Sequence, residues 1–493
     1  MPHRARFQAS LRVLTRIALL MVLLAGMAFG AKSAAFYARL RRLNAAQTIQ
    51  FLPAEIPPDS ATRLLVFAPH CDDETLGSAG LIQQTLKAGG AVQVAILTNG
   101  DAFPAAAQRE FRSLRLHAAD YSRFAALRQQ ESKNALQSLG VPARSVQFFG
   151  YPDRGLMPLW VAHWTADKPY YAPTTQRNTT EAALSVYPNA PYCGRGLLEN
   201  IKTTLRDFRP TLVTVTHPAE DHPDHAAAAA FVALALRELQ SEPQSAVWAK
   251  EVRLQYYLVH CGDWPVPPGS PNESLAPPAA LMGLDTAWNR CPLTKSETER
   301  KAQAIAAYPT QTAMMGPFLR SFARSNEIYG QQSAVKLTRL ADDANPMAEN
   351  ATGWKSLSPA VRSPLADNLA REMEPGADIA AIRACRDSKN FYLQIEMRGA
   401  VRSRFDYTVW LRALGKRGES RPTALILRLS PQTGSDADGA EIKARGRFLT
   451  LAVPLKRLMP DAPNSIATLT FRVETALTGV SIDQTGIAIL STN

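Results

Sequence analysis

The chain has 493 residues, too many for one ordinary hydrophobic core, so we expect two or three domains. Its hydrophobic content of 46% and charged content of 20% are those of a globular protein and exclude an intrinsically disordered chain. The formal net charge of +12 raises the question of a nucleic-acid partner, and the positions of the charges answer it.

The excess of basic residues lies at the N-terminus. Residues 1–50 contain eight of the 55 Lys and Arg residues and no Asp or Glu. The rest of the chain contains 47 basic and 43 acidic residues and is nearly neutral. A nucleic-acid-binding protein concentrates its positive charge on the folded domain, so we expect no nucleic-acid partner.

The basic N-terminus precedes an apolar segment. Residues 17–31 are uncharged, and small residues follow in "GAKSAA". This order matches the basic, apolar and cleavage regions of a signal peptide, whereas fifteen uncharged residues are short for a membrane span. We expect residues 1–40 to be a signal peptide or an N-terminal membrane anchor. Either one exports the protein, which would be periplasmic or tethered to the inner membrane, with membrane contact at the N-terminus.

From about residue 60, apolar and helical segments alternate. The predicted strands are "TRLLVFAP", "AVQVAILT", "SVQFFGYP", "TLVTVTH" and "EVRLQYYLVH". The predicted helices include "GLIQQTLKAGG", "ALRQQESKNALQSLGV", "LLENIKTTLRDFRP" and "HPDHAAAAAFVALALRELQ". This alternation predicts an α/β, Rossmann-like domain over residues 60–330, with a mostly parallel sheet and helices on both faces. No G-x-G-x-x-G follows the first strand, so a dinucleotide is not expected.

The pattern changes after about residue 330. The polar segment 331–354 is predicted to be a linker. Short apolar segments then follow one another without helices between them, which predicts an all-β sandwich over residues 355–493. Its aromatic residues would suit either sugar stacking in a carbohydrate-binding module or packing in the core; they include Phe391, Tyr392, Tyr407 and Trp410.

The first predicted strand runs into a polar cluster. The sequence "APHCDDE" places His70, Asp72, Asp73 and Glu74 where a buried strand ends. In α/β sheets, ligands bind beyond the carboxyl ends of the strands. A catalytic zinc ion has three protein ligands and a water, and His and Asp are good zinc ligands. The cluster therefore offers two of the three ligands.

A second cluster follows the strand "TLVTVTH". Its members are His217, Glu220, Asp221, His222, Asp224 and His225. Four of the eight histidines of the chain lie in the two clusters. Core or helix-capping histidines would explain one such residue, but charged groups are rarely buried without a function. We therefore predict that both clusters contribute to one metal site.

"PHCDDE" together with "HPDH" resembles the paired motifs of the PIG-L/LmbE deacetylase family, which includes N-acetylglucosaminyl-phosphatidylinositol deacetylases. The family's first motif usually reads His-Pro-Asp-Asp-Glu, so Cys71 stands at the position of the proline. Further similar segments are "RQQESKNALQSLGV", "FFGYPDRGL", "KAQAIAAYPTQ" and "RSNEIYG". The resemblance covers about residues 62–330.

The resemblance implies a zinc-dependent N-deacetylase that holds one divalent ion per chain. His70, Asp73 and His225 would bind the zinc. Asp72 would be the general base, and His222 would stabilise or protonate the reacting group. The implied substrate is an N-acetylamino sugar in a glycan, glycolipid or sugar conjugate. The alternative is a non-catalytic glycan-binding protein on the same scaffold, but retention of the whole set of residues favours the enzyme.

Two further residues are candidates for substrate binding. Arg128 would contact a sugar or a phosphate, or else pair with Glu131 on the surface of its helix. Asp153 would bind sugar hydroxyls, or else cap the turn in "YPDRG".

Other members of the clusters have two interpretations each. Asp224 would orient a histidine ligand or cap a helix. Glu74 is expected to support its loop rather than bind metal. His217 and His260 would reach the site or merely end their strands.

The five cysteines leave at least one unpaired if the others form disulfides. Cys261 and Cys291 flank a Pro-rich segment, and a disulfide between them is one expectation, although the sequence does not determine pairing among these two, Cys193 and Cys385. Cys71 is expected to fill space beside the metal site, because a fourth protein ligand would close the position that water needs.

Overall fold

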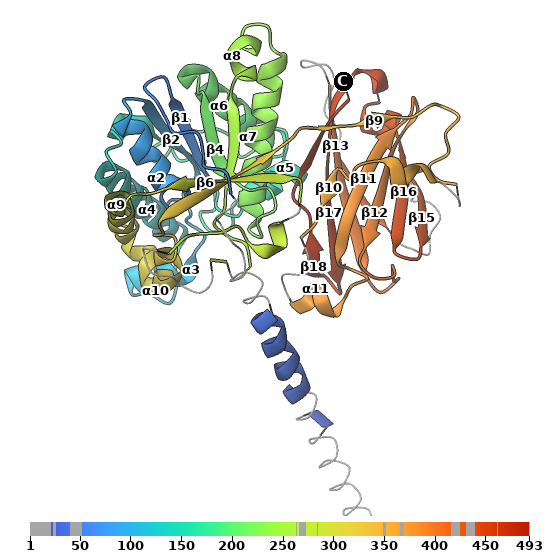
Figure 1. Cartoon of the computed structure of the whole chain (residues 1–493), viewed down its shortest axis with the longest axis horizontal. Coiled ribbons are helices and arrows are strands. Elements are labelled where there is room, and N and C mark those ends of the chain that lie inside the picture. Colours follow the sequence, from blue (N-terminus) through green and yellow to red (C-terminus); the bar gives the residue numbers. More distant parts are fainter. Residues whose placement is uncertain are drawn as a thin grey trace, which may run out of the picture.

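The computed structural model describes residues 21–22, 26–39, 52–262, 264–265, 273–282, 284–348, 352–364, 369–415, 424–429, 439–460 and 462–492. Of the predicted apolar N-terminal segment, residues 17–20 and 23–25 lie outside these ranges. Residues 26–39 are helical and extend from the lower end of the molecule (Figure 1). Within the described ranges, no helix combines the length and apolar character needed to cross a membrane.

The first half of the described chain forms a sheet with the strand order β3-β2-β1-β4-β5-β7-β6. The strands are β1 (Arg63–Ala68), β2 (Ala91–Thr98), β3 (Val146–Tyr151), β4 (Leu212–Thr216), β5 (Arg253–Tyr257), β6 (Thr286–Pro292) and β7 (Asn326–Gln332). β1 to β5 are parallel, whereas β7 is antiparallel to both of its neighbours. The predicted mostly parallel sheet is therefore confirmed, and the sequence did not predict its antiparallel edge.

Helices cover both faces of this sheet (Figure 1). They are α2 (Asp73–Lys87), α3 (Pro104–Phe111), α4 (Ala118–Ser138), α5 (Leu156–Val161), α6 (Gly194–Phe208), α7 (Pro223–Ser241), α8 (Ala246–Lys250), α9 (Lys295–Ala306) and α10 (Pro309–Arg320). Alternate residues of β1 face opposite sides. Leu64 and Val66 pack in one apolar cluster with α2, α4 and α9, and Leu65 and Phe67 pack in another with α5, α6 and α7. This alternation places one apolar core on each side of the sheet.

The sheet register brings the two polar clusters together. β1 pairs with β4 in parallel, with Leu64 opposite Leu212 and Val66 opposite Thr214. Both strands therefore end at the same edge of the sheet. The loops that follow them lie side by side at this edge, where α/β proteins bind ligands.

The C-terminal part is a sandwich of two mainly antiparallel sheets, so the predicted fold class is confirmed here as well. One sheet contains β9 (Thr338–Arg339), β10 (Val361–Arg362), β11 (Ile379–Arg386), β12 (Asn390–Met397), β15 (Glu441–Arg445) and β16 (Phe448–Pro454). The other contains β8 (Val335–Lys336), β13 (Asp406–Gly415), β14 (Ala424–Leu429), β17 (Ile466–Leu477), β18 (Val480–Gln484) and β19 (Ala488–Ser491). Two short helices, α11 (Leu369–Met373) and α12 (Leu455–Leu458), accompany them.

Segment 331–354, predicted to be a linker, contributes strands to both sheets of the sandwich. β8 pairs in parallel with β19, and β9 pairs in parallel with β11. These two-residue strands were too short for the sequence to show. The segment thus belongs structurally to the sandwich at these positions.

The aromatic residues of the sandwich are mostly in its core. Phe391 and Tyr407 are fully buried between the two sheets, and Tyr392 is buried in a smaller cluster. Trp410 is half-buried, with the guanidinium carbon of Arg472 4.9 Å from the ring centroid. Core packing is therefore the correct interpretation for Phe391 and Tyr407, which offer no face to a sugar.

All five cysteines lie in the described part of the chain, and none forms a disulfide. The expected bridge between Cys261 and Cys291 is therefore wrong. Cys291 lies on the edge strand β6, and its thiol donates to Oε1 of Gln84 at 3.4 Å. Both cysteines are buried in the apolar cluster beside α2, so packing accounts for them.

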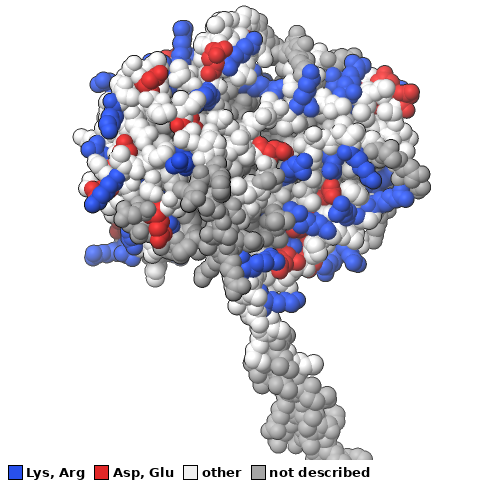
Figure 2. Space-filling view, in the orientation of Figure 1, with Lys and Arg blue, Asp and Glu red and all other residues white. Residues whose placement is uncertain are grey.

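On the face shown in Figure 2, acidic and basic side chains are interspersed over the α/β domain, and basic side chains are denser over the sandwich.

Candidate metal centre and active site

The loop between β1 and α2 carries the first cluster. α2 begins at Asp73, and Asp72 before it has φ 129° and ψ −31°, a conformation that only glycine adopts without strain. Glu74 stabilises this backbone, because its Oε2 accepts from the N–H of Asp72 at 3.0 Å. Its Oε1 accepts from the hydroxyl of Tyr308 at 2.7 Å. Glu74 thus supports the loop, and both of its carboxylate oxygens are engaged in doing so.

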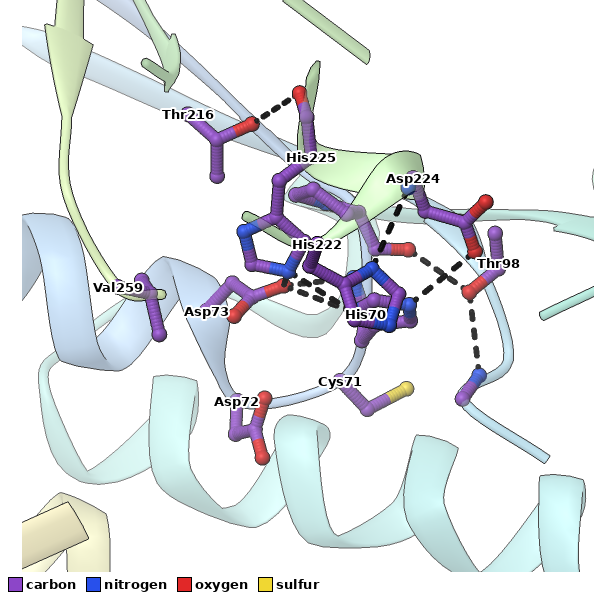
Figure 3. Close-up of polar contacts among 12 residues, drawn as sticks. His70, Cys71, Asp72, Asp73, Thr98, Thr216, His222, Asp224, His225 and Val259 are labelled. Atoms are coloured by element: carbon purple, nitrogen blue, oxygen red, sulfur yellow. Dashed lines mark hydrogen bonds and ion pairs between the residues drawn. The ribbon is translucent and has the colours of Figure 1, made fainter. Parts of the chain in front are cut away.

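Three predicted ligand atoms form a nearly equilateral triangle (Figure 3). Nδ1 of His70 lies 3.3 Å from Oδ2 of Asp73 and 3.1 Å from Nε2 of His225. Nε2 of His225 lies 3.2 Å from the same Asp73 oxygen. On a tetrahedral zinc ion with ligands about 2.0–2.1 Å away, neighbouring ligand atoms are roughly 3.3 Å apart. The three residues therefore fit three corners of such a site.

Carboxylates behind the two histidines fix their protons. Nε2 of His70 lies 3.2 Å from Oδ1 of Asp153 and 3.3 Å from Oδ2 of Asp224. Nδ1 of His225 lies 2.5 Å from Oε2 of Glu220. A neutral imidazole that donates to a carboxylate presents the lone pair of its other nitrogen. Two nitrogen lone pairs and a carboxylate oxygen then point into the triangle, which is an arrangement suited to binding a cation.

Of the two roles expected for Asp224, the structure shows the contact with a histidine and not the helix cap. His222, not Asp224, is the N-cap residue of α7. Asp224 is fully buried and accepts from the backbone N–H groups of Arg154 and Leu156 at 2.6 and 2.9 Å, besides contacting His70. It therefore connects His70, a predicted ligand, with the segment that leads into α5.

His222 lies at the start of α7 with its ring beside the triangle. Its ring centroid is 4.8 Å from that of His70 and 5.1 Å from that of His225. Burial, together with the neighbouring histidines, lowers the pKa of His222 to about 2, so the imidazole is neutral. Its Nδ1 accepts from the backbone N–H of Asp224 at 3.3 Å. The proton is then on Nε2, which is a hydrogen-bond donor at the site.

Asp72 is held from one side by Arg128. Nη2 of Arg128 donates to Oδ2 of Asp72 at 3.1 Å, whereas Oδ1 has no hydrogen-bond partner among the described residues. Burial raises the pKa of Asp72 to about 8, although Arg128 acts in the opposite direction. One carboxylate oxygen is thus available to accept a proton.

Arg128 is buried next to Asp72. Only 4% of the residue is exposed. Besides Asp72, its guanidinium donates to the carbonyl oxygens of Gly100 at 2.6 Å and of Cys71 at 2.5 Å. Glu131, the alternative partner, accepts instead from the N–H and hydroxyl of Thr310 at 2.9 and 2.6 Å. The structure therefore shows Arg128 bound to two strand-end loops and to Asp72, and not paired with Glu131. Its contact with a sugar or a phosphate stays a prediction.

Asp153 lies at the rim of the triangle, beside His70. Its Oδ2 accepts from the N–H of Ala102 at 2.8 Å, while Oδ1 faces the imidazole. The nearby Asp101 is 3% exposed, and burial followed by the charge of Asp153 raises its pKa to about 7. Asp153 is thus within reach of a ligand at the site, in addition to its contacts with the protein.

His260 and His217, which follow two of the strands, differ in their distance from the site. His260 reaches the site, because its ring centroid is 4.8 Å from that of His225 and its ligand atom groups with those of Asp73 and His225 within 4.8 Å. His217 does not reach it. Its ring stacks on Trp288 at 5.3 Å, and burial lowers its pKa to about 3. His217 ends its strand without joining the cluster.

Cys71 packs into the apolar cluster on the α2 side of the sheet and is fully buried. In Figure 3 its sulfur points away from Asp73 and His225. Burial raises the pKa of its thiol, which disfavours the thiolate that a metal would bind. The structure agrees with a space-filling role.

Glu220 is a member of the candidate site to which the sequence analysis gave no role. Its Oε1 accepts from the N–H of Val259 at 2.5 Å, and its Oε2 accepts from the N–H of His260 at 3.2 Å while contacting His225. The signal available in the sequence was an acidic residue five positions before a predicted histidine ligand.

The fold and the buried His–Asp cluster define an α/β domain with a candidate metal centre. Residues 65–236 match the family model described as "PIG-L: GlcNAc-PI de-N-acetylase". This match agrees with the resemblance seen in the sequence. A comparison with curated protein sequences finds no relative of the chain.

Several solved structures are similar to the α/β part. The pseudoaglycone deacetylase Dbv21 is 22% identical, covering 55% of this chain and 96% of its own, with a TM-score of 0.35. The N,N′-diacetylchitobiose deacetylase from Pyrococcus horikoshii is 17% identical, covering 60% and 91%, with a TM-score of 0.33. The 4-carboxy-2-hydroxymuconate hydratase GalB from Pseudomonas putida is 17% identical, covering 53% and 82%, with a TM-score of 0.33.

Proposed function

We propose that the protein is a zinc-dependent hydrolase that removes the N-acetyl group from an N-acetylamino sugar in a glycan, glycolipid or sugar conjugate. The observation that carries this proposal is the triangle of His70 Nδ1, Asp73 Oδ2 and His225 Nε2, with sides of 3.1–3.3 Å. The PIG-L family model, whose description names a de-N-acetylase, supports the choice of reaction.

His70, Asp73 and His225 would hold one zinc ion, with Asp224 and Glu220 keeping the two imidazoles in the binding tautomer. Zinc in such a site polarises a carbonyl group and lowers the pKa of a bound water towards neutrality. The surrounding carboxylates supply the negative charge that a divalent cation needs in a buried site.

Two residues of this chain would move or hold protons during hydrolysis. Oδ1 of Asp72 accepts the proton of the attacking water, while Arg128 keeps the other oxygen in place. Nε2–H of His222 donates to the amide oxygen as the amide carbon becomes tetrahedral. Asp153 is within reach of a sugar hydroxyl at the rim.

The same proposal includes export, because the basic and apolar pattern of residues 1–40 is that of a signal peptide or membrane anchor. The protein would then act in the periplasm or at the inner membrane. Cell fractionation, with sequencing of the mature N-terminus, distinguishes a cleaved from a retained segment. Recovery of the intact chain in the cytosol would contradict export.

The decisive experiment measures acetate release from a panel of N-acetylated glycans and glycolipids, with and without a chelator. We expect release that the chelator abolishes and added zinc restores. Asp72→Asn should keep the metal and lose most of the activity. Hydrolysis by Asp72→Asn at the wild-type rate would contradict the mechanism, and binding of glycans without any acetate release would favour the non-catalytic alternative.

A further inference from the structure

The sandwich contacts the α/β domain directly beside the candidate active site. The connection between β18 and β19 lies against the loop between β4 and α7, the loop that carries His222. Gly486 packs so closely on this loop that a Cβ atom there would lie 2.1 Å from the carbonyl oxygen of Pro218. A glycine is therefore required at this position for the observed contact.

A hydrogen bond strengthens the same contact. Nε2 of Gln484 donates to the carbonyl oxygen of Asp221, the residue before His222, at 3.3 Å. On its other side, Asp221 donates its N–H to the carbonyl oxygen of His260 at 3.0 Å, and its Oδ2 accepts from the N–H of Gly262 at 2.5 Å. The loop is thus held between the α/β domain and the sandwich.

A second contact reaches the other flank of the site. The guanidinium of Arg412 on β13 donates to the carbonyl oxygen of Trp160 at the end of α5, at 2.5 Å, and lies 4.3 Å from the ring centroid of Trp164. The start of α5 is bound in turn by Asp224, the partner of His70. Figure 1 shows α5 at the boundary between the two parts, beside β13.

Between these contacts, packing is incomplete. A cavity of about 300 Å³ lies between the domains, lined on one side by Glu220, Asp221 and Pro223 and on the other by Arg472 and Gln484. The loop before His222 therefore has no continuous layer of side chains behind it. On the sandwich side, Gly486 and Gln484 make the contacts that hold this loop.

We propose that the sandwich is a positioning part of the active site: its β18–β19 connection holds the loop that places Nε2–H of His222 at the substrate carbonyl. Gly486 and Gln484 are then positioning residues, and the sandwich acts on turnover even with substrates too small to touch it. This inference rests on the proposed hydrolysis, but the position of the loop can be measured without it.

The test compares Gly486→Ala with Gly353→Ala in the full chain. Gly353 is a matched control because a Cβ atom there would meet nothing within 4 Å. With a small N-acetylglucosamine glycoside, we expect Gly486→Ala to lower kcat at least tenfold, since a displacement of about 1 Å at a catalytic group costs up to 100-fold. KM and zinc content should change little, and Gly353→Ala should match the wild type. Unchanged kcat in Gly486→Ala would overturn the proposal.

A double variant separates positioning of His222 from general destabilisation. If Gly486 acts through His222, Gly486→Ala should cost nothing further in a His222→Ala background. A full multiplicative loss in the double variant would overturn the proposal. Gln484→Ala removes the hydrogen bonds of one side chain, to the carbonyl oxygen of Asp221 and from the guanidinium of Arg472, and adds no bulk. It should therefore give a smaller loss of kcat and still fold if Gly486→Ala does not.

Hydrogen exchange provides the measurement that needs no activity. Backbone amides of residues 219–222 should exchange faster in Gly486→Ala and Gln484→Ala than in Gly353→Ala and the wild type. Equal exchange in all four proteins would overturn the inference. Faster exchange in an enzyme that releases no acetate from any substrate would instead contradict the proposed function and leave the contact established.

Discussion

Nδ1 of His222 accepts a hydrogen bond from the backbone N–H of Asp224, 3.3 Å away, and this single contact determines which nitrogen of the ring donates at the site. The backbone at the first turn of a helix offers its N–H groups without a partner inside the helix, so His222 caps α7 and is oriented by it.

Replacement of His222 by alanine should therefore affect turnover and not the metal. We expect kcat to fall about 100- to 1,000-fold, the loss usual for one donor to a developing oxyanion. Zinc content should remain at one ion per chain, measured by metal analysis of the purified protein. His163→Ala, which changes a histidine outside the cluster, is the control. Loss of zinc in His222→Ala would show that the residue is a ligand.

Removal of the metal should lower the stability of the protein. A ligand that binds only the folded state stabilises it by about 4 kcal/mol when its free concentration is 1,000 times Kd. Thermal unfolding of the wild type should occur several degrees lower in a chelator and recover with zinc. Asp73→Asn should bind no zinc and unfold at the same temperature with and without the chelator. The exposed substitution Glu299→Gln should behave as the wild type.

Replacement of Arg128 distinguishes a structural role of this residue from direct substrate binding. Because its guanidinium is bound to two backbone carbonyls and to Asp72, Arg128→Met should reduce the free energy of unfolding by about 3–5 kcal/mol. Denaturant unfolding measures this loss, and Arg123→Met on the exposed face of the same helix should cost little. A raised KM with unchanged stability would instead support the direct sugar contact expected from the sequence.

Cys71 should be dispensable for metal binding. Cys71→Ala removes a buried thiol from the apolar core, so we expect a loss of about 1 kcal/mol in stability, with zinc content and kcat unchanged. In the native protein the thiol should resist alkylation because it is fully buried and its pKa is raised. Loss of zinc in the alanine variant would identify the sulfur as a ligand.

The sequence predicted the parts of the fold that follow from hydrophobic patterning. The strands preceding both clusters are rich in apolar and β-branched residues, and their parallel pairing brings His70 and His225 together. The start of α2 was predicted seven residues too late, near Gly80 instead of at Asp73. The first turn of this helix is polar yet buried, because the metal site and Tyr308 supply its partners, and periodicity alone cannot show that.

The antiparallel edge of the sheet and the contacts of Arg128 could not be predicted from the sequence for a related reason. β7 contains the buried Glu327, which pairs with Lys301 at 2.7 Å, so its pattern does not resemble that of an apolar strand. Arg128 binds carbonyl oxygens of the loops that follow β1 and β2. These two loops come together only when the sheet has formed. Local patterning predicts elements, whereas these contacts depend on residues distant in the chain.

The short strands β8 and β9 decide where the chain can be divided. A recombinant fragment beginning at residue 355 would lack both strands and would expose backbone groups of β19 and β11. Because unpaired strand edges promote aggregation, such a fragment should aggregate. A fragment beginning near residue 333 would keep these edges covered. A fragment that contains the complete sandwich must therefore begin before Val335. This start lies about twenty residues before residue 355, the boundary expected from the sequence.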